Sequence, residues 1–336
     1  GPPTNLSIEY RSTTLATETQ LVTPSSRTTL DDSIVFFDGR FVPLHEATVN
    51  IATHALHYGT GCFEGIRGYW VERHEELYVL KLPEHVDRFF RSCNVLRIRP
   101  PFTQEDMAEF ILEVVRSNEF RADVYIRPLA FKSAQTIKLT LSSLDDSFAI
   151  FAFPFGHYAH REGGLRVCMS PWRRVDDTAI PTRAKVTGSY VNASLASDDA
   201  TRAGYDEALM LTHAGNLSEA SSANIFLVRG GKVVTPALSE SILEGITREC
   251  VIDLVQNQLG LEVVERTVGR TEPYLADEVF LSGTGVQIEP VVSIDGVEVG
   301  SGLPGPVTTR LQDLYARAVR NQSAEHHGWC TPVYGS

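Results

Sequence analysis

Apolar and polar residues in the first half of the chain follow two different periods. Short stretches rich in β-branched and aromatic residues predict strands at residues 33–44, 76–82, 122–131 and 147–155. The Asp38-Gly39 pair inside the first stretch is a turn signal, so this stretch is expected to form a hairpin. Segments 83–96 and 103–118 place apolar residues three and four positions apart, which predicts amphipathic helices, the second with Thr103 as its cap.

The second half of the chain has the same two periods but more strands. A helix rich in small residues is expected from about Gly188 to Ala203. Residues 207–236 are expected to hold three short strands, with turns at Ala214-Gly215 and Gly230-Gly231. Further strands are predicted at 165–172, 261–268, 277–285 and 288–300, and helices at 246–260 and 305–322.

This order of elements predicts an α/β (α+β) protein of two domains, since 336 residues are enough for two sizeable cores. Residues 33–156 would form a small N-terminal α/β domain, and residues 165–336 a large C-terminal domain. The polar, Gly-containing segment 157–164 would be the interdomain loop. Residues 1–32 are rich in Ser, Thr and Pro and are expected to be a disordered extension.

The amino-acid composition excludes several classes of binding partner for this protein. The formal net charge is −12, with 42 acidic and 30 basic residues, so the chain repels nucleic acid and anionic membranes. No apolar run approaches the ~20 residues of a membrane span, and the start has no apolar core of a signal peptide. The five cysteines are widely spaced without a CxxC pair, which indicates neither disulfides nor a metal site. We therefore expect a cytoplasmic protein with reduced thiols.

Lysine is scarce, which allows each one to be considered separately. The chain has five lysines against 25 arginines (30 basic residues minus 5), namely Lys81, Lys132, Lys138, Lys185 and Lys232. Lys232 follows a Gly-Gly turn and is expected to be exposed, and Lys81 lies at a strand end where a solvated charge is usual. Lys132 and Lys138 would lie on the surface or at the rim of a pocket.

Lys185 has unusual neighbours. Pro181 stiffens the chain before it, and the small residues Gly188, Ser189 and Ala193 follow it. Small residues leave space for a bulky planar cofactor, and a desolvated lysine is nucleophilic enough to form a Schiff base. The same pattern also suits a lysine packed beside the start of a helix, and the local spacing alone leaves both interpretations open.

Two segments could bind a phosphate group. Gly245-Ile246-Thr247 begins a helix, where free N–H groups and the helix dipole favour an anion. Ser282-Gly283-Thr284-Gly285 follows a strand, and its glycines allow backbone N–H groups to approach an anion. Arg88 could add a bidentate contact. The alternatives are an ordinary helix cap, an ordinary turn and a surface salt bridge.

Glu219 and Tyr190 are further candidates. Glu219 lies among small residues, and its carboxylate could pair with the nitrogen of a pyridine ring. Tyr190 follows Lys185 by five positions and could hydrogen-bond a ring hydroxyl. A solvated loop acid and a core tyrosine are the alternatives.

Six segments of the chain form a recognisable set: HALHYGTGCFEGIRGY, YIRPLAF, IPTRAKVTGSYVNASLA, GYDEALMLTHAGNLSEASSANIF, LEGITRE and LADEVFLSGTGVQIEPV. Together they resemble one family, the class IV pyridoxal 5′-phosphate (PLP) enzymes, and most of all the branched-chain amino-acid aminotransferases. The resemblance runs from about residue 36 to HHGWCTPV near the end of the chain and implies fold type IV, the D-amino-acid aminotransferase-like fold, with a cofactor-binding C-terminal domain.

The resemblance implies roles in cofactor binding. Lys185 would be the catalytic residue, which carries PLP as a Schiff base and moves a proton between the substrate Cα and the cofactor. Glu219 would contact the pyridine nitrogen, Tyr190 the ring hydroxyl and Leu243 a face of the ring. The phosphate would be held by Arg88, Ile246, Thr247 and Thr284, with Gly245, Ser282 and Gly283 beside them in the cofactor site.

The resemblance also implies a substrate pocket and a reaction. Thr284 and Gly285 would bind the substrate α-carboxylate through backbone N–H groups, and Arg127 the distal carboxylate of glutamate or 2-oxoglutarate. The pocket walls would be Tyr58, Phe63, Tyr125, Phe155 and Tyr158. Leucine, isoleucine and valine would be converted to 2-oxo acids, and 2-oxoglutarate to glutamate, in a ping-pong reaction. A homodimer or an assembly of dimers is expected, because the family builds each site with residues from a neighbouring chain.

Some residues depart from the family pattern and leave specificity open. The loop at 131–146, which covers the pocket in the family, differs from bacterial branched-chain enzymes; Phe155 replaces a tryptophan and Ala220 a glycine of many relatives. A transaminase of (R)-amines or D-amino acids is one alternative, although Leu129 stands where D-amino-acid enzymes carry a histidine two positions after Arg127. A non-catalytic binding protein would be expected to have lost Lys185 or Glu219, and both are present.

Overall fold

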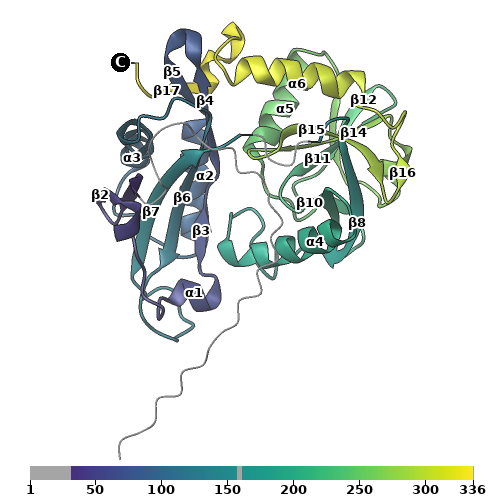
Figure 1. Ribbon diagram of the computed structural model, residues 1–336. Helices are drawn as coiled ribbons and strands as arrows, with labels where there is room; N and C mark the ends of the chain where they lie inside the picture. Colours follow the sequence, from purple (N-terminus) through teal and green to yellow (C-terminus); the bar gives the residue numbers. More distant parts are fainter. Residues whose placement is uncertain (1–31, 157–160, 336) are drawn as a thin grey trace, which may run out of the picture.

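The computed structural model describes residues 32–156 and 161–335. The expected extension, apart from Asp32, and residues 157–160 of the expected interdomain loop lie outside this range. The described residues form two β-sheets that stand side by side, with helices packed on each (Figure 1). This mixed α/β architecture confirms the fold class expected from the sequence.

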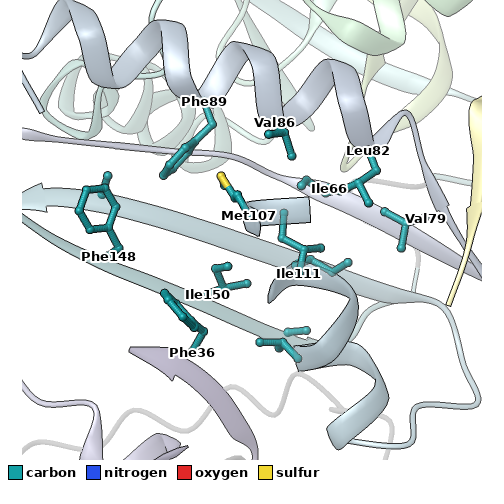
Figure 2. Packing of buried hydrophobic residues seen from close by; sticks show 14 of the residues in the cluster. Phe36, Ile66, Val79, Leu82, Val86, Phe89, Met107, Ile111, Phe148 and Ile150 are labelled. Atoms are coloured by element: carbon teal, nitrogen blue, oxygen red, sulfur yellow. The ribbon is translucent and has the colours of Figure 1, made fainter. Parts of the chain in front are cut away.

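The first sheet has the order β17-β5-β4-β6-β7-β1-β2, with β3 paired to β6. Its strands are β1 Ile34–Phe37, β2 Arg40–Pro43, β3 Gly61–Phe63, β4 Ile66–Val71, β5 Glu76–Leu80, β6 Val124–Lys132, β7 Asp146–Pro154 and β17 Cys330–Pro332. Helices α2 (Leu82–Val95) and α3 (Gln104–Ser117) bury their apolar stripes against it. Figure 2 shows this core, in which Phe89 and Met107 from the helices pack near Ile66, Phe148 and Ile150 of the strands.

Two local signals in this domain act as expected. The hairpin of β1 and β2 closes through Asp38 (φ 45°) and Gly39 (φ 83°), the positive angles that a tight two-residue hairpin turn requires. Helix α3 begins with a capping box, in which the Thr103 side chain accepts from the Asp106 N–H and the Asp106 carboxylate accepts from the Thr103 N–H. Both predictions are confirmed.

The second sheet has the order β10-β9-β8-β15-β14-β11-β12-β13, with β16 paired to β15. Its strands are β8 Leu165–Arg173, β9 Glu207–Leu211, β10 Leu217–Ala220, β11 Asn224–Arg229, β12 Lys232–Pro236, β13 Val263–Arg266, β14 Glu278–Gly283, β15 Gln287–Ile294 and β16 Val297–Glu298. The helices around it are α4 Tyr190–Arg202, α5 Ile246–Asn257 and α6 Pro306–Ala318.

Alternation along these strands explains where the helices pack. On β14, Val279 and Leu281 face a core made by the strands, whereas Phe280 packs with α5 and α6. On β9, Leu209 belongs to the same strand core, whereas Met210 packs against α4. Because successive side chains point to opposite faces, the sheet encloses one core and carries its helices on the other face.

Three features differ from the sequence expectation. Residues 207–236 form four strands instead of three, because 217–220 and 224–229 pair with different neighbours, β9 and β14. Helix α1 (His54–Tyr58) and strands β3 and β4 lie in a segment to which no element was assigned, since its glycines obscured the pattern. Strand β17 pairs with β5 of the first sheet, so the end of the chain joins the N-terminal sheet. The domain boundaries otherwise stay a prediction.

The two sheets share a core that fixes their relative position. Tyr69 and Leu80 of the first sheet pack with Phe226, Leu311 and Tyr315 of the second half. Within 32–156 and 161–335, no helix combines the length and hydropathy of a membrane span.

Candidate active site

A cavity of about 620 Å³ lies between the two sheets and is lined by residues from both. It brings together most of the residues that the sequence singled out, although they are spread over more than 200 positions of the chain. Those that line it are Phe63, Arg88, Tyr125, Arg127, Phe155, Lys185, Tyr190, Glu219, Leu243, Gly245, Ile246, Thr247, Ser282, Gly283, Thr284 and Gly285.

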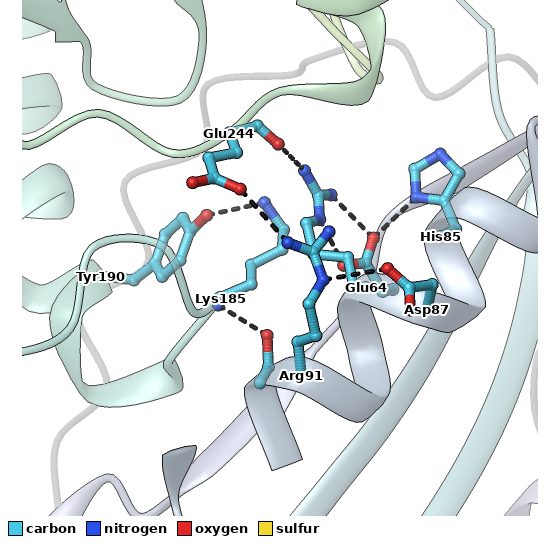
Figure 3. Close-up of polar contacts among 9 residues, drawn as sticks. Glu64, His85, Asp87, Arg91, Lys185, Tyr190 and Glu244 are labelled. Carbon is cyan, nitrogen blue, oxygen red and sulfur yellow. Dashed lines mark hydrogen bonds and ion pairs between the residues drawn. The ribbon is translucent and has the colours of Figure 1, made fainter. Parts of the chain in front are cut away.

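Lys185 is held by elements of the first domain although it belongs to the second half of the chain. Its backbone N–H donates to Ser92 Oγ on α2 at 3.1 Å, and its carbonyl accepts from the Phe63 N–H on β3 at 3.1 Å. Its Nζ donates to the Tyr190 hydroxyl at 2.7 Å (Figure 3) and lies 5.0 Å from the centre of the Phe63 ring. The Lys185 backbone is therefore held by α2 through its N–H and by β3 through its carbonyl, while its amine extends into the cavity.

Glu219 is a buried carboxylate at the end of β10 with three donors around it. Its Oε1 is 2.9 Å from Arg174 Nη2, and its Oε2 accepts from Asn224 Nδ2 at 3.0 Å and from the Leu243 N–H at 3.1 Å. Burial raises the pKa of Glu219, and the nearby charge of Arg174 is the largest influence that lowers it. The sequence analysis singled out neither residue: Arg174 lies outside the six family segments, and Asn224 lies within one of them but was given no role.

Arg88 is a buried partner of Glu64, which the sequence analysis did not consider. Its Nε and Nη2 donate to the Glu64 carboxylate at 2.7 and 2.8 Å, and its Nη1 donates to the Glu244 carbonyl at 2.8 Å. The expected alternative of a surface salt bridge is wrong, since both side chains are almost fully buried. A guanidinium has five N–H donors, and these three bonds leave two for a ligand. Figure 3 labels Glu64 and Glu244, the two partners of Arg88, near Lys185.

The start of α5 is free to bind an anion. Its N-cap is Gly245, and no side chain of the described residues caps the first turn. The N–H groups of Ile246 and Thr247, both on the cavity wall, are therefore available at the positive end of the helix dipole. Ser282 Oγ, also on the wall, is buried and has no hydrogen-bond partner among the described residues. Free main-chain donors, an orphaned hydroxyl and the spare donors of Arg88 fit a phosphate group, and Glu219 and Lys185 fit a pyridine ring with an aldehyde.

The rest of the cavity is aromatic, with one cation. The Arg127 guanidinium lies 4.3 Å from the centre of the Phe63 ring and donates through Nη2 to the Tyr125 hydroxyl at 2.8 Å. No ion pair of Arg127 occurs within the described part of the chain, so its charge is available to a carboxylate. The sequence identified Phe155, which directly follows β7, but missed Phe151 and Phe153, which precede it at every second position in β7 and also line the cavity.

Three expectations fall elsewhere. Tyr58 does not line the cavity of its own chain; it lies on α1, 41% exposed, and donates to the Ile137 carbonyl at 3.2 Å. Tyr158 lies outside the described residues. Lys132, expected at the surface or at a pocket rim, is instead 1% exposed, with its Nζ 2.8 Å from Asp146.

Comparisons with known proteins agree with this geometry. The family model described as amino-transferase class IV matches residues 61–294. A probable branched-chain-amino-acid aminotransferase of Aquifex aeolicus is 45% identical over 301 residues, which are 89% of this chain and 96% of the relative. The branched-chain aminotransferase of Thermoproteus uzoniensis, solved with norvaline, superposes with a TM-score of 0.85 at 42% identity, covering 90% of this chain and 99% of that one. The T.th. branched-chain enzyme complexed with N-(5′-phosphopyridoxyl)-L-glutamate gives a TM-score of 0.86 at 40% identity, covering 91% and 100%.

The chain belongs to the class IV aminotransferase family. The relatives that it matches over nearly their whole length are branched-chain amino-acid aminotransferases, which confirms the resemblance seen in the sequence motifs.

Proposed function

We propose that this chain is a PLP-dependent aminotransferase that converts leucine, isoleucine and valine to their 2-oxo acids and 2-oxoglutarate to glutamate. The observation that carries the proposal is the position of Lys185 Nζ, 2.7 Å from the Tyr190 hydroxyl in a cavity that also holds Glu219 and the uncapped start of α5. The named ligands of the structural relatives, norvaline and a phosphopyridoxyl-glutamate adduct, support both the cofactor and the two kinds of substrate.

PLP, when bound, supplies an aldehyde that takes up the substrate amine and a ring that accepts electrons from the substrate Cα. Lys185 would hold the cofactor covalently between reactions, and its released Nζ would carry the Cα proton as a general base. The Tyr190 hydroxyl, which now accepts from Nζ, would bind the oxygen on the cofactor ring. Glu219 would hold the ring nitrogen.

Phosphate binding would use donors that are already in place. The N–H groups of Ile246 and Thr247, the unpartnered Ser282 hydroxyl, Thr284 and the free donors of Arg88 all belong to residues that line the cavity. Because these groups need no rearrangement, they would anchor the cofactor while Lys185 is released from it.

The substrate pocket would accept an apolar and an acidic side chain in turn. Phe63, Tyr125 and Phe155 would bury a branched aliphatic chain, which favours binding in proportion to the area removed from water. Arg127 would pair with the distal carboxylate of glutamate. It stacks on Phe63 and bonds to the Tyr125 hydroxyl, so its charge remains partly satisfied when leucine is bound.

We further propose that the protein is a homodimer and that Tyr58 serves the partner's cavity. An apolar patch made of Ile51, Leu56, Tyr58, Ile137 and Leu139 lies on α1, on the turn just before it and on the loop that packs on it. Its four aliphatic residues are 62–86% exposed, and an exposed apolar group of this size commonly marks an interface. Tyr58 lies in this patch and not in its own cavity, as expected for a residue that reaches a neighbouring site.

We also infer a reducing, cytoplasmic setting. All five cysteines are free thiols, and Cys62 and Cys93 share a hydrogen bond between sulfur atoms 3.6 Å apart instead of a disulfide.

The proposed function is tested by a half-reaction screen. The protein is loaded with PLP and mixed separately with L-leucine, L-valine, D-alanine and (R)-1-phenylethylamine, and the change in cofactor absorbance is followed. L-leucine and L-valine are expected to convert the cofactor at least tenfold faster than the other two. Lys185→Ala should bind the cofactor only without a covalent link and should show no turnover with L-leucine. Conversion by the D-amino acid or the amine alone, or turnover by Lys185→Ala, would contradict the proposal.

A further inference from the structure

Arg174 lines the cavity beside Glu219 and belongs to none of the six family segments. It follows strand β8, where its backbone N–H donates to the Leu211 carbonyl at 2.8 Å, and its side chain is 9% exposed. Within the described residues its only carboxylate partner is Glu219, at 2.9 Å. Burial of an arginine and its acid partner costs desolvation free energy, which the close contact between the two charges offsets.

We infer that Arg174 is a positioning residue that keeps Glu219 ionised, so that this carboxylate can accept a hydrogen bond from a protonated pyridine nitrogen. The inference rests on the proposed function, because it assigns a task to Arg174 within the same cofactor site.

The hydrogen bonds of Glu219 leave room for one more donor. An ionised carboxylate offers about four acceptor positions. Arg174 takes one on Oε1, and Asn224 and the Leu243 N–H take two on Oε2. The position that remains is on Oε1, and Glu219 is one of the residues that line the cavity. A neutral Glu219 would use this position for its own proton and would become a donor toward the ring, which then stays uncharged.

Charge determines which of these two states is present. Burial is the largest influence on Glu219 and raises its pKa, so the ionised form needs a nearby cation. Two cations act on it, Arg174 and Lys185. The charge of Lys185 would change whenever its Nζ forms or breaks the covalent link to the cofactor. The Arg174 guanidinium, in contrast, stays protonated at every pH at which the enzyme works. Arg174 is therefore the cation that can hold Glu219 ionised throughout a reaction.

The charge of Glu219 can be measured without the cofactor. Infrared spectra of the apoprotein are compared at neutral pH for the wild type, Arg174→Met, Glu219→Gln and the double variant. Arg174→Met should show a protonated carboxylic-acid band that is absent from the wild type and from the double variant. Arg174→Lys, which keeps a cation, should lack this band. Arg173→Met, a change at the exposed neighbour, is the matched control and should resemble the wild type.

Kinetics of the PLP-loaded proteins give a second readout. Arg174→Met should lower kcat by at least tenfold with little change in KM for leucine. The double variant should be no slower than Glu219→Gln alone, because both changes remove the same negative charge. If Arg174 has only a structural role, the losses in kcat of the two single variants should add up in the double variant.

Several outcomes would overturn the inference. One is an Arg174→Met spectrum without a carboxylic-acid band, and another is a full additive loss in the double variant. If Arg174→Met does not fold, the wild-type spectrum tests the inference instead. A carboxylic-acid band that is present in the wild type at neutral pH and absent from Glu219→Gln would show that Glu219 is not ionised. A wild type that has no such band but neither binds PLP nor transaminates would refute the proposed function and leave the pairing of Arg174 with Glu219 standing.

Discussion

Glu64 is a carboxylate with no exposure to solvent, held by two side chains of α2. Its two oxygens accept from Arg88 Nε and Nη2, and Oε2 lies 2.7 Å from His85 Nδ1. Burial alone would raise the pKa of Glu64, but the charge of Arg88 and the hydrogen bonds from Arg88 and His85 outweigh it and lower the pKa well below its usual range. The ionised form of Glu64 is therefore part of the folded state.

This shift makes stability depend on pH in a defined direction. A carboxylate whose pKa is lower in the folded state stabilises the protein fully above its unfolded pKa, about 4.3, and loses this contribution as the pH falls toward its folded pKa. Glu64→Gln should lower the free energy of unfolding by about 3–5 kcal/mol at neutral pH, since Arg88 is left buried without its partner. The difference from the wild type should shrink below pH about 4. Urea unfolding followed by circular dichroism at the two pH values measures both quantities.

Glu262→Gln is the matched control for Glu64→Gln. Glu262 pairs with Lys232 at 2.7 Å, but both side chains are more than half exposed. Such a pair contributes about 0–1 kcal/mol, so this variant should be nearly as stable as the wild type. An equal loss in both variants, or a loss in Glu64→Gln that does not change with pH, would show that Glu64 does not act through its charge.

At the scale of elements, the start of helix α5 can contact a phosphate group because its N-cap residue, Gly245, has no side chain. A Cβ on Gly245 would lie 1.9 Å from Asn224 Oδ1, and Asn224 Nδ2 donates to Glu219 and to the Leu243 carbonyl. Gly245→Ala must therefore displace either the helix start or Asn224. We expect it to weaken PLP binding to the apoprotein at least tenfold, about 1.4 kcal/mol, as measured by titration of the cofactor absorbance.

Gly328→Ala is the control for Gly245→Ala. A Cβ there meets no atom within 4 Å, and the backbone angle is one that alanine adopts. Its affinity for PLP should equal that of the wild type. If Gly245→Ala also binds with wild-type affinity, the close approach of α5 to Asn224 is not needed for the cofactor.

Local signals in the sequence predicted some elements well, and distant contacts explain those that were missed. The Asp38-Gly39 turn and the Thr103 capping box depend on residues within three positions, so the sequence shows them directly. Helix α6 was expected at 305–322, but the residue that caps its start was not, because Glu278 accepts the Thr308 N–H from 30 positions away. Strand β17 is likewise defined by its pairing with β5, far earlier in the chain. Spacing patterns contain no information on such contacts.

At the scale of the whole molecule, the candidate active site shows the same difference between residues marked by local sequence and residues defined by distant contacts. Motif residues such as Lys185 and Glu219 could be singled out by residue type and by small neighbours, and the fold brings them to one cavity. Arg174 could not be predicted in this way, because its importance comes from a contact across strands with Glu219. Tyr58 was expected at the cavity but lies on the surface, since the sequence does not say which chain a residue serves.

The assignment of Tyr58 to a neighbouring chain predicts complementation between two defective proteins. Lys185→Ala should be inactive alone, and Tyr58→Ala should have a KM for leucine raised at least tenfold. When both are co-expressed with different tags and the mixed dimer is purified, one of its two sites contains Lys185 from one chain and Tyr58 from the other. We therefore expect wild-type KM with roughly half the wild-type kcat per dimer.

A second mixed dimer separates this explanation from simple stabilisation by dimer formation. Lys185 and Glu219 line the cavity of the same chain, so a dimer of Lys185→Ala with Glu219→Gln contains no complete site and should stay nearly inactive. If Tyr58 served its own cavity, the first mixed dimer would also lack a complete site, and its KM would remain as high as that of Tyr58→Ala. A protein that is monomeric in light scattering and fully active would rule out any such sharing, and the exposed apolar patch on α1 would then need another occupant.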